Sequence, residues 1–350
     1  MKALLLCGGE GTRLRPFTYT QPKALLPLGH QPILFHILDT LAGAGLREAA
    51  IIIGPNGEPI VTLLRQTNRW DFRFTFIPQP QPLGLAHTVL IAREVLGDEP
   101  FLMYLGDNLL EEPLRPLLDR FTQEKPDALL LLRPVKNPRH FGVARIDGSR
   151  VIRVEEKPAQ PTSNLALAGI YLFSPAIHQA VRAIKPSRRG ELEITDAIQW
   201  LIESRKTVTY HLITGWWKDT GTVDDLLTAN QYVLKKMASA VHGEVKKTQV
   251  NGVLAVKKGA LLKNCLVKGP VSIGAGCRIS GSVLGPYLSV GDGVEITNCC
   301  LSRSLVFPNA QLKGVTLTDS ILGERVRVSG AGRKEKAYSL LIGADGILNL

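Results

Sequence analysis

The chain has 350 residues, of which 45% are hydrophobic and 21% charged, and its formal net charge is +11. This length can hold two domains, and the composition is that of an ordinary globular protein. No apolar run reaches the length of a membrane span, and the short apolar start reads as a strand rather than a secretory signal. The basic residues are scattered without interleaved aromatic residues, so we expect neither a nucleic-acid nor a membrane partner.

The five cysteines show no paired framework and no C-x-x-C spacing. Such spacing is what structural zinc sites and disulfide frameworks require. We therefore expect a cytoplasmic protein without a zinc site.

Strand and helix patterns alternate over residues 1–235, as judged from short apolar runs and from helical periodicity that ends at glycine or proline. The predicted elements in chain order are strand 3–6, helix 33–44, strand 49–53, helix 58–66, strand 72–77, helix 85–96, strand 101–105, helix 113–121, strand 128–132, a hairpin near 147–148, strand 151–155, strand 164–173, helices from 175 and 193, strand 208–212 and helix 223–236. This order predicts a Rossmann-like, doubly wound α/β sheet that becomes mixed after residue 141. Ligands of such sheets lie at the carboxyl ends of the strands.

Residues 253–330 follow a different rule, because apolar residues recur there at every sixth position with occasional slips. The recurring residues are Leu261, Val267, Ile273, Ile279, Leu284, Val290, Ile296, Val306 and Leu312. Six is neither a helical nor a strand period, and it predicts the hexapeptide coils of a left-handed parallel β-helix. We therefore predict two domains, residues 1–240 and residues 241–350, and expect the exposed coil faces to support a homo-oligomer.

A glycine-rich loop follows the first strand as Gly8-Gly9-Glu10-Gly11-Thr12-Arg13, and Lys23 comes ten residues later. Glycines let backbone N–H groups approach a polyanion, and two cations complete a phosphate site. A Walker loop would need a lysine directly after the last glycine, and a dinucleotide loop would need a further glycine, so the spacing excludes both. The loop predicts a site for a nucleoside triphosphate.

The stretch from Gly8 to Thr18, together with Pro22-Lys23-Ala24-Leu25-Leu26-Pro27, resembles the signature of the sugar nucleotidyltransferases. The resemblance implies that residues 1–240 are a catalytic domain whose loop binds the triphosphate of the nucleotide. The residues that it assigns to the loop are Gly8, Gly9, Gly11 and Thr12. It also implies that Arg13 stabilises the leaving pyrophosphate and that Lys23 contacts the nucleotide phosphates.

Two aspartates match the metal-binding pair of that family, Asp107 after the strand 101–105 and Asp219 in Trp217-Lys218-Asp219-Thr220-Gly221. Mg²⁺ in such sites takes one or two protein carboxylates and completes its shell with phosphate oxygens and water. The resemblance therefore implies a Mg²⁺ cofactor and metal-assisted phosphoryl transfer.

The stretch Glu155-Glu156-Lys157-Pro158 follows a predicted strand. The resemblance implies that Lys157 is a catalytic residue that holds the sugar phosphate and that Glu156 accepts sugar hydroxyls. Gly142 and Leu167 match positions whose backbone amides meet the sugar, and Glu193 matches a further position near it.

A glutamine amide can both donate to and accept from a pyrimidine edge, and Gln79 lies five residues before Gly84. The resemblance implies that Gln79 recognises the base and that Gly84 lies at the nucleotide. The motif Leu83-Gly84-Leu85-Ala86 resembles that of the glucose-1-phosphate thymidylyltransferases in the family. The predicted β-helix matches the long form of these enzymes. The resemblance implies dTTP and glucose 1-phosphate as substrates.

Two alternatives stay open. One is a uridylyltransferase of the same fold that acts on UTP and on glucose or N-acetylglucosamine 1-phosphate. The other is a non-catalytic subunit that binds nucleotide sugars. Acyltransferase activity in the β-helix is disfavoured, because the last histidine is His242, before the repeats, and such activity generally uses a histidine base.

Overall fold

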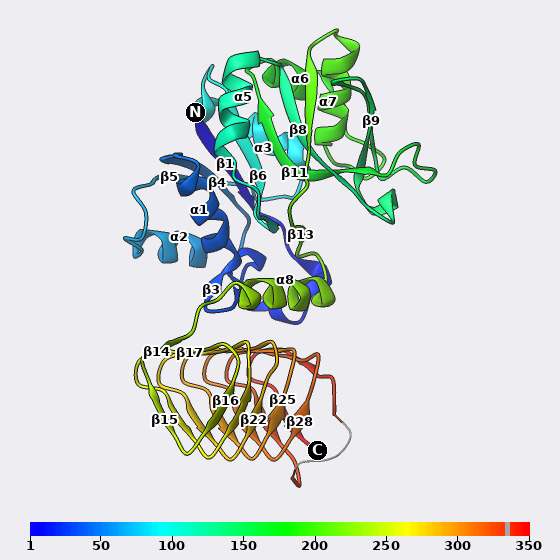
Figure 1. Ribbon diagram of the computed structural model, residues 1–350. Helices are drawn as coiled ribbons and strands as arrows, with labels where there is room; N and C mark the ends of the chain where they lie inside the picture. Colours follow the sequence, from blue (N-terminus) through cyan, green and yellow to red (C-terminus); the bar gives the residue numbers. More distant parts are fainter. Residues whose placement is uncertain (333–336) are drawn as a thin grey trace. The chain divides into compact units, whose positions relative to one another are not determined.

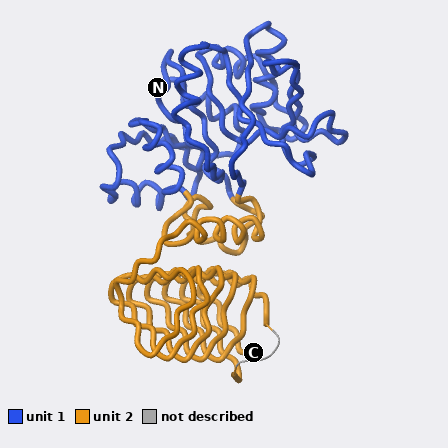
Figure 2. Tube along the Cα trace, viewed as in Figure 1, with its two compact units in different colours: residues 1–10, 34–219 blue, residues 11–33, 220–350 orange. Residues whose placement is uncertain are grey.

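The computed structural model describes residues 1–332 and 337–350, which form two compact units (Figure 1). One unit comprises residues 1–10 and 34–219, and the other comprises residues 11–33 and 220–350 (Figure 2). The domain boundary expected at residue 240 stays a prediction. Among the described residues, no helix combines the length and apolar character that crossing a membrane requires.

The first unit contains a nine-stranded sheet with the strand order β5-β4-β1-β6-β11-β8-β12-β10-β9. The strands are β1 (Lys2–Cys7), β4 (Glu48–Ile53), β5 (Arg73–Pro78), β6 (Phe101–Leu105), β8 (Ala128–Pro134), β9 (Gly142–Asp147), β10 (Arg150–Glu156), β11 (Leu165–Phe173) and β12 (Val208–Leu212). β1 runs parallel to β4 and β6, whereas β11 runs antiparallel to β6 and β8. The predicted mixed α/β sheet is therefore confirmed.

Helices cover both faces of this sheet. They are α1 (Ile33–Gly43), α2 (Glu58–Arg65), α3 (Leu85–Ile91), α4 (Arg93–Leu96), α5 (Arg115–Glu124), α6 (Ile177–Ala183) and α7 (Ile194–Glu203). Leu4 of β1 belongs to a core that includes residues of α3, α6 and α7, while Ala3 and Leu5, which point to the opposite face, are also fully buried. Burial on both faces explains why β1 reads as a continuous apolar run. The predicted helix 85–96 is interrupted at Ala92, between α3 and α4.

A small two-stranded antiparallel sheet completes this unit, formed by β7 (Asn108–Leu110) and β13 (Trp217–Asp219). It pairs two segments that are more than a hundred residues apart in the sequence. It is central to the candidate site, because both predicted metal ligands lie on or beside it.

The second unit contains a three-sided parallel β-helix, which confirms the predicted β-helix. One side consists of β14 (Ala240–Val241), β17 (Leu254–Val256), β20 (Val271–Ile273), β23 (Leu288–Val290), β26 (Ser304–Val306), β29 (Ile321–Leu322) and β31 (Leu341–Ile342). The second side consists of β15 (Glu244–Lys246), β18 (Leu261–Lys263), β21 (Arg278–Ser280), β24 (Glu295–Thr297), β27 (Gln311–Lys313), β30 (Arg327–Ser329) and β32 (Ile347–Asn349). The third side consists of β16 (Gln249–Asn251), β19 (Leu266–Lys268), β22 (Val283–Leu284), β25 (Cys300–Leu301) and β28 (Thr316–Leu317).

The coils are slightly shorter than three hexapeptides. Leu254 pairs with Val271 and then Val271 with Leu288, each one residue short of eighteen, and Leu288 pairs with Ser304, two residues short. Side chains of a strand alternate between its faces, and on the second side of the β-helix the middle residue points inward. Leu262 is therefore the fully buried residue of β18, and the sequence pattern was wrong by one position in assigning Leu261 to the interior.

Residues 11–33 pack in the same unit as α8 (Val223–Lys235) and the β-helix. The segment contains three short 3-10 helices (Thr12–Leu14, Phe17–Tyr19, Lys23–Leu25) and a small hairpin of β2 (Pro27–Leu28) and β3 (Gln31–Pro32). His30, between these strands, lies with Nδ1 2.8 Å from Oγ of the buried Ser272. Burial and the charge of Lys257 lower the pKa of His30 to about 4, against the opposite effect of Asp292.

We expect the low pKa of His30 to make the stability of this unit sensitive to acid. Between pH 6.5 and 4 the unfolded chain protonates His30 while the folded chain does not, so the free energy of unfolding falls as pH decreases, by up to about 3 kcal/mol. Urea unfolding at several pH values should show a smaller loss for His30→Asn. The exposed His242→Asn provides the matched control. Equal acid sensitivity in the parent and His30→Asn would contradict the prediction.

Candidate functional site

The glycine loop begins at the carboxyl end of β1, where it meets the segments that follow β4 and β5. A Cβ added to Gly8 would lie 3.3 Å from Oε1 of Gln79 and 3.4 Å from the backbone nitrogen of Gly54. Gly54 follows β4 and Gln79 follows β5. The structure thus brings the predicted base-reading glutamine beside the predicted phosphate loop, and the absence of a side chain at Gly8 permits this close approach.

The Gln79 side chain is buried and held by its neighbours. Its Nε2 lies 3.0 Å from Nδ1 of His87 and donates to the carbonyl of Gly84 over 3.4 Å. Burial lowers the pKa of His87, so this ring stays neutral and its Nδ1 can accept from the amide. These contacts fix the plane of the Gln79 amide.

Gly84 connects the base-reading side of the site to the loop before α7. Its φ is +100°, and a Cβ there would lie 2.4 Å from the carbonyl oxygen of Leu192. The backbone is paired on both sides of this contact: Leu192 donates to Leu83, and Ala86 donates to Leu192. Since Glu193 follows Leu192 directly, the predicted nucleotide and sugar residues lie on paired backbone segments.

The two predicted metal ligands come together through the small antiparallel sheet. Asp219 in β13 pairs with Asn108 in β7, and Asp107 is the residue before Asn108. The Asn108 amide donates to Oδ1 of Asp107 over 3.0 Å. One carboxylate on β13 and one directly before β7 are a donor set that fits Mg²⁺, which takes its remaining ligands from phosphate and water.

Cys7 lies close enough to Asp107 to be affected by its charge. Burial, reinforced by that charge, raises the pKa of Cys7 to about 12. The thiol therefore stays protonated and adds no soft ligand beside the carboxylates. Among the residues that the structure describes, no group of three or more His, Cys, Asp or Glu residues forms a metal cluster.

Glu112 and Arg133 hold the turn that leads into β13. Oε1 of Glu112 accepts from the backbone N–H of Thr214 and of Gly215, and Oε2 lies 2.8 Å from Nε2 of His211. Arg133 donates to the carbonyls of Ile213 and Gly215. Although burial opposes it, hydrogen bonds from Gly215, Thr214 and His211 lower the pKa of Glu112 to about 2, so this carboxylate is ionised at neutral pH.

The predicted sugar residues form a second group. A Cβ added to Gly142 would lie 2.7 Å from Cδ1 of Leu167 and 3.3 Å from Oε2 of Glu156. The Thr195 hydroxyl donates to the same Oε2 over 3.3 Å, and Lys157 Nζ lies 3.4 Å from Oε1. The structure therefore brings together residues from β9, β10, β11 and α7 around the Glu156 carboxylate.

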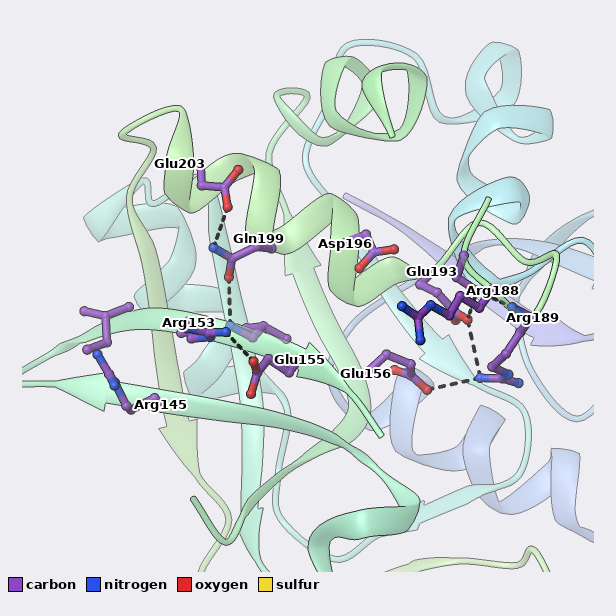
Figure 3. A pocket seen from close by; sticks show the side chains of 13 residues that line it. Arg145, Arg153, Glu155, Glu156, Arg188, Arg189, Glu193, Asp196, Gln199 and Glu203 are labelled. Carbon is purple, nitrogen blue, oxygen red and sulfur yellow. Dashed lines mark hydrogen bonds and ion pairs between the residues drawn. The ribbon is translucent and has the colours of Figure 1, made fainter. Parts of the chain in front are cut away.

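A cavity of about 700 Å³ lies between the β9–β10 hairpin, α7 and the loop at Arg188 and Arg189 (Figure 3). Arg189 lies 3.4 Å from both Glu156 and Glu193 and 2.9 Å from Glu191. Burial and the charge of Glu156 raise the pKa of Glu193, while a hydrogen bond from Ser187 opposes the shift. The cavity is thus lined by both carboxylates and arginines, and Arg189 lies between the carboxylates of Glu156 and Glu193.

Two contacts join the sugar group to the aspartate pair. A Cβ added to Gly169 of β11 would lie 2.8 Å from Nδ2 of Asn108. The indole N–H of Trp217 donates to the carbonyl of Ala168 over 3.0 Å. The Asp107–Asp219 pair and the Glu156 group therefore flank the same stretch of β11.

Gly9 follows Gly8 in the first unit, and the remaining predicted residues belong to the second unit. Gly11, with φ of +62°, begins the turn that contains Thr12 and the exposed Arg13. A Cβ on Gly11 would lie 3.3 Å from Cβ of Lys23, so the turn that carries Arg13 lies beside Lys23. Thr18 closes the turn by donating its hydroxyl to the carbonyl of Gly11 over 2.8 Å.

Sequence reasoning did not identify Glu112, Arg133 and Arg189 as parts of the site. Glu112 and Arg133 act on a turn some eighty or more residues away in the sequence, and no local motif signals such contacts. Arg189 lies four residues before Glu193 in the sequence. This short distance from a predicted site residue was the only signal that could have pointed to Arg189.

Comparisons with known proteins give a consistent result. The family model described as nucleotidyl transferase matches residues 2–236. Glucose-1-phosphate thymidylyltransferase of Streptomyces griseus is 43% identical over 346 residues, and that of Streptomyces antibioticus is 42% identical over 347 residues; each alignment covers 98% of both chains. Among solved structures, a candidate glucose-1-phosphate thymidylyltransferase of Bacillus anthracis in complex with sucrose matches with a TM-score of 0.63 at 35% identity, over 69% of this chain and 98% of that one.

The contact of Gly84 with Leu192 makes a specific prediction. Gly84→Ala should destabilise the protein by more than Gly97→Ala, because both glycines have positive φ but a Cβ at Gly97 meets nothing within 4 Å. Both backbones lie in a region that only glycine readily adopts, which costs about 1–3 kcal/mol for alanine, and the clash with the Leu192 backbone adds to this cost at Gly84. Urea unfolding of both variants measures the difference. Equal losses of stability would show that the contact is not tight.

Proposed function

The chain belongs to the nucleotidyl transferase family, and on that premise we propose that it transfers a thymidylyl group from dTTP to glucose 1-phosphate and releases pyrophosphate. The observation that carries the proposal is the grouping, within one unit, of Gln79 beside the Gly8 loop, the Asp107–Asp219 pair and the predicted sugar residues around the Glu156 carboxylate. A base reader, a metal-binding pair and a polyol site are the parts that this reaction requires.

The reaction is an in-line displacement at the α-phosphorus of the nucleotide. A phosphate oxygen of the sugar phosphate forms the new P–O bond, and the bond from the α-phosphorus to the oxygen that bridges to the β-phosphorus breaks. The electron pair leaves with pyrophosphate. Because the attacking phosphate is already an anion, no covalent enzyme intermediate is needed, and the protein contributes positioning and charge neutralisation.

The basic residues serve the phosphates. The amides of Gly8, Gly9, Gly11 and Thr12 bind the triphosphate, and the Arg13 guanidinium donates to the departing pyrophosphate. Lys23 neutralises nucleotide phosphates, and Lys157 holds the phosphate of the attacking sugar.

Gln79 reads the pyrimidine. Its amide oxygen accepts from N3–H, a donor that cytosine and adenine lack at that edge, while its amide nitrogen stays bound to His87 and Gly84. Thymine and uracil share this edge and differ in one methyl group. The amide therefore does not separate dTTP from UTP, and UTP with glucose or N-acetylglucosamine 1-phosphate is the alternative substrate pair.

The sugar subsite uses the group around Glu156. Carboxyl oxygens accept hydrogen bonds from sugar hydroxyls, which suits Glu156 and Glu193. The backbone at Gly142 and Leu167 closes this subsite, since Gly142 leaves no room for a side chain beside Leu167 and Glu156.

Asp107 and Asp219 would hold the Mg²⁺ ion. When bound, the ion would neutralise the phosphate oxygens that crowd together during the displacement. Asn108 holds the Asp107 carboxylate, and the Glu112-bound turn leads into the strand that carries Asp219. A homo-oligomer built through the β-helix, and a cytoplasmic location, stay predictions.

A substrate panel tests the proposed reaction. With Mg²⁺ present, pyrophosphate release should be fastest with dTTP and glucose 1-phosphate among four nucleoside triphosphates and several sugar 1-phosphates. A preference for UTP would establish the alternative substrate pair. Absence of turnover with every pair would favour a non-catalytic subunit that binds nucleotide sugars.

Two substitutions test the assigned roles. Arg13→Ala should lower kcat on the order of a hundredfold, by analogy with the loss of a single donor to a developing anion. Asp107→Asn should make the rate depend on higher Mg²⁺ concentrations, and Arg150→Ala, at an exposed position, serves as the charge-matched control for Arg13. Near-normal pyrophosphate release in both Arg13→Ala and Asp107→Asn would refute the proposed roles.

A further inference from the structure

The basic segment that carries Arg13 and Lys23 lies in the compact unit of the β-helix. Residues 11–33 group with residues 220–350, whereas the chain on either side of the segment belongs to the other unit (Figure 2). The segment contains three 3-10 turns and a hairpin of two-residue strands, which is too little regular structure to be stable alone. Yet Phe17, Leu26 and Leu28 are at most 2% exposed, so other elements must cover them.

An apolar contact connects the β-helix to the turn that carries Arg13. The rings of Phe17 and Phe307 lie 5.8 Å apart, and both side chains are 2% exposed. Thr18, the residue after Phe17, donates to the carbonyl of Gly11 over 2.8 Å. The placement of the turn Gly11–Arg13 is thus linked, through two adjacent residues, to a side chain of the β-helix.

A buried amide makes a second connection at the other end of the segment. Oδ1 of Asn230 in α8 accepts from the backbone N–H of Gly29 over 2.9 Å and from Oγ of Ser289 over 2.8 Å. Asn230 is 1% exposed and Ser289 is 2% exposed. One oxygen therefore joins the segment, α8 and the β-helix, and removing it would leave the buried Ser289 hydroxyl and the half-buried Gly29 N–H without this acceptor.

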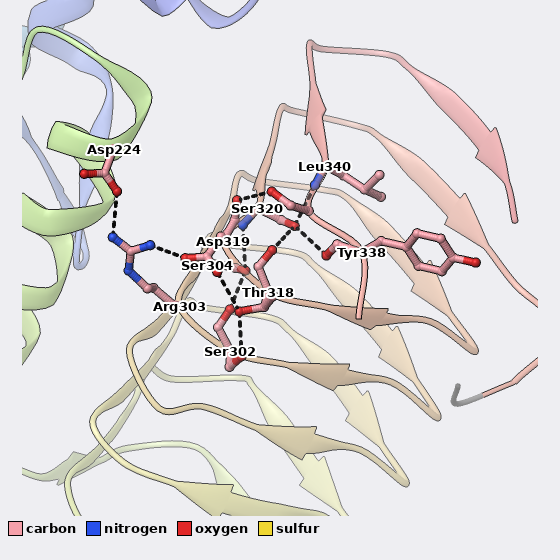
Figure 4. A network of polar contacts seen from close by, with 10 residues as sticks. Asp224, Ser302, Arg303, Ser304, Thr318, Asp319, Ser320, Tyr338 and Leu340 are labelled. Carbon is pink, nitrogen blue, oxygen red and sulfur yellow. Dashed lines mark hydrogen bonds and ion pairs between the residues drawn. The ribbon is translucent and has the colours of Figure 1, made fainter. Parts of the chain in front are cut away.

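The helix that carries Asn230 is itself fixed on the β-helix. Arg303 donates to Asp224, in the first turn of α8, over 2.8 Å, and it also binds Asp319 of the next coil (Figure 4). In the same view the hydroxyls of Ser302 and Thr318 are hydrogen-bonded along the stack of coils. The scaffold beneath the segment is held by ion pairs and hydrogen bonds as well as by apolar packing.

We propose that the β-helix and α8 position the phosphate-binding segment, with Phe307 and Asn230 as positioning residues for Arg13 and Lys23. This inference rests on the phosphate-binding role proposed above for the segment. Errors of about 1 Å in the placement of a catalytic group can cost a hundredfold in rate, so a rigid support for a segment without its own core has a direct functional value. Under the alternative, the β-helix serves only assembly, and substitutions beside the segment behave like any other substitution in the β-helix.

The test uses the full-length variants Phe307→Leu and Asn230→Ala. Binding of dTTP with Mg²⁺, measured calorimetrically without sugar phosphate, should weaken by about tenfold, a shift within reach of a single lost contact. The KM for the sugar phosphate should change much less. Amide hydrogen exchange over residues 11–26 should accelerate in both variants, which reports the loss of support independently of activity.

Matched controls separate positioning from general destabilisation. Ile296→Val alters the interior of the β-helix on a different side, and Asn251→Ala removes an exposed asparagine from its third side. Both controls should bind dTTP as the parent does, whatever their unfolding midpoints. Folded Phe307→Leu or Asn230→Ala protein that binds dTTP with the parental affinity would overturn the proposal, and Phe307→Leu decides alone if Asn230→Ala does not fold.

The Arg13→Ala variant distinguishes this proposal from the function beneath it. If Arg13→Ala releases pyrophosphate normally, the assigned role of the segment fails. If Arg13→Ala is impaired while Phe307→Leu and Asn230→Ala bind dTTP normally, the role of the segment stands and only the scaffold proposal fails.

Discussion

The parallel pairing of β1 with β4 and β6 is the constraint on which the candidate site depends. Parallel strands end at the same edge of a sheet, so the residues after β1, β4, β5 and β6 must meet there. Gly8, Gln79 and Asp107 occupy three of these positions.

Much of the fold could be predicted because each signal was local. The strand at residues 49–53 and the helix at 223–236 lie within one residue of β4 and α8, since an apolar run and a helical periodicity mark them. The misplacement of Leu261 arose because coils of sixteen or seventeen residues drift against a period of six. The break at Ala92 had no comparable signal, as no glycine or proline marks it.

The parts of the candidate site that belong to a sequence motif could be predicted. The parts that depend on tertiary contacts could not. The neighbourhood of Asp107 and Asp219 was expected, and the structure explains it by the pairing of β13 with β7. The supporting residues Glu112 and Arg133 could not be found, because a carboxylate that binds N–H groups a hundred residues away leaves no pattern in the sequence. The assignment of residues 11–33 to the unit of the β-helix also depended on packing alone.

The contact between Phe17 and Phe307 has a consequence for the order in which the protein matures. During synthesis the amino-terminal residues leave the ribosome first, and domains commonly fold as they emerge. The sheet can form its first parallel pairs early, but Phe17 has no partner ring until nearly the whole chain has been made. Nascent and truncated chains therefore lack part of the buried support of the segment that bears Arg13. This support becomes complete only when the chain itself is nearly complete.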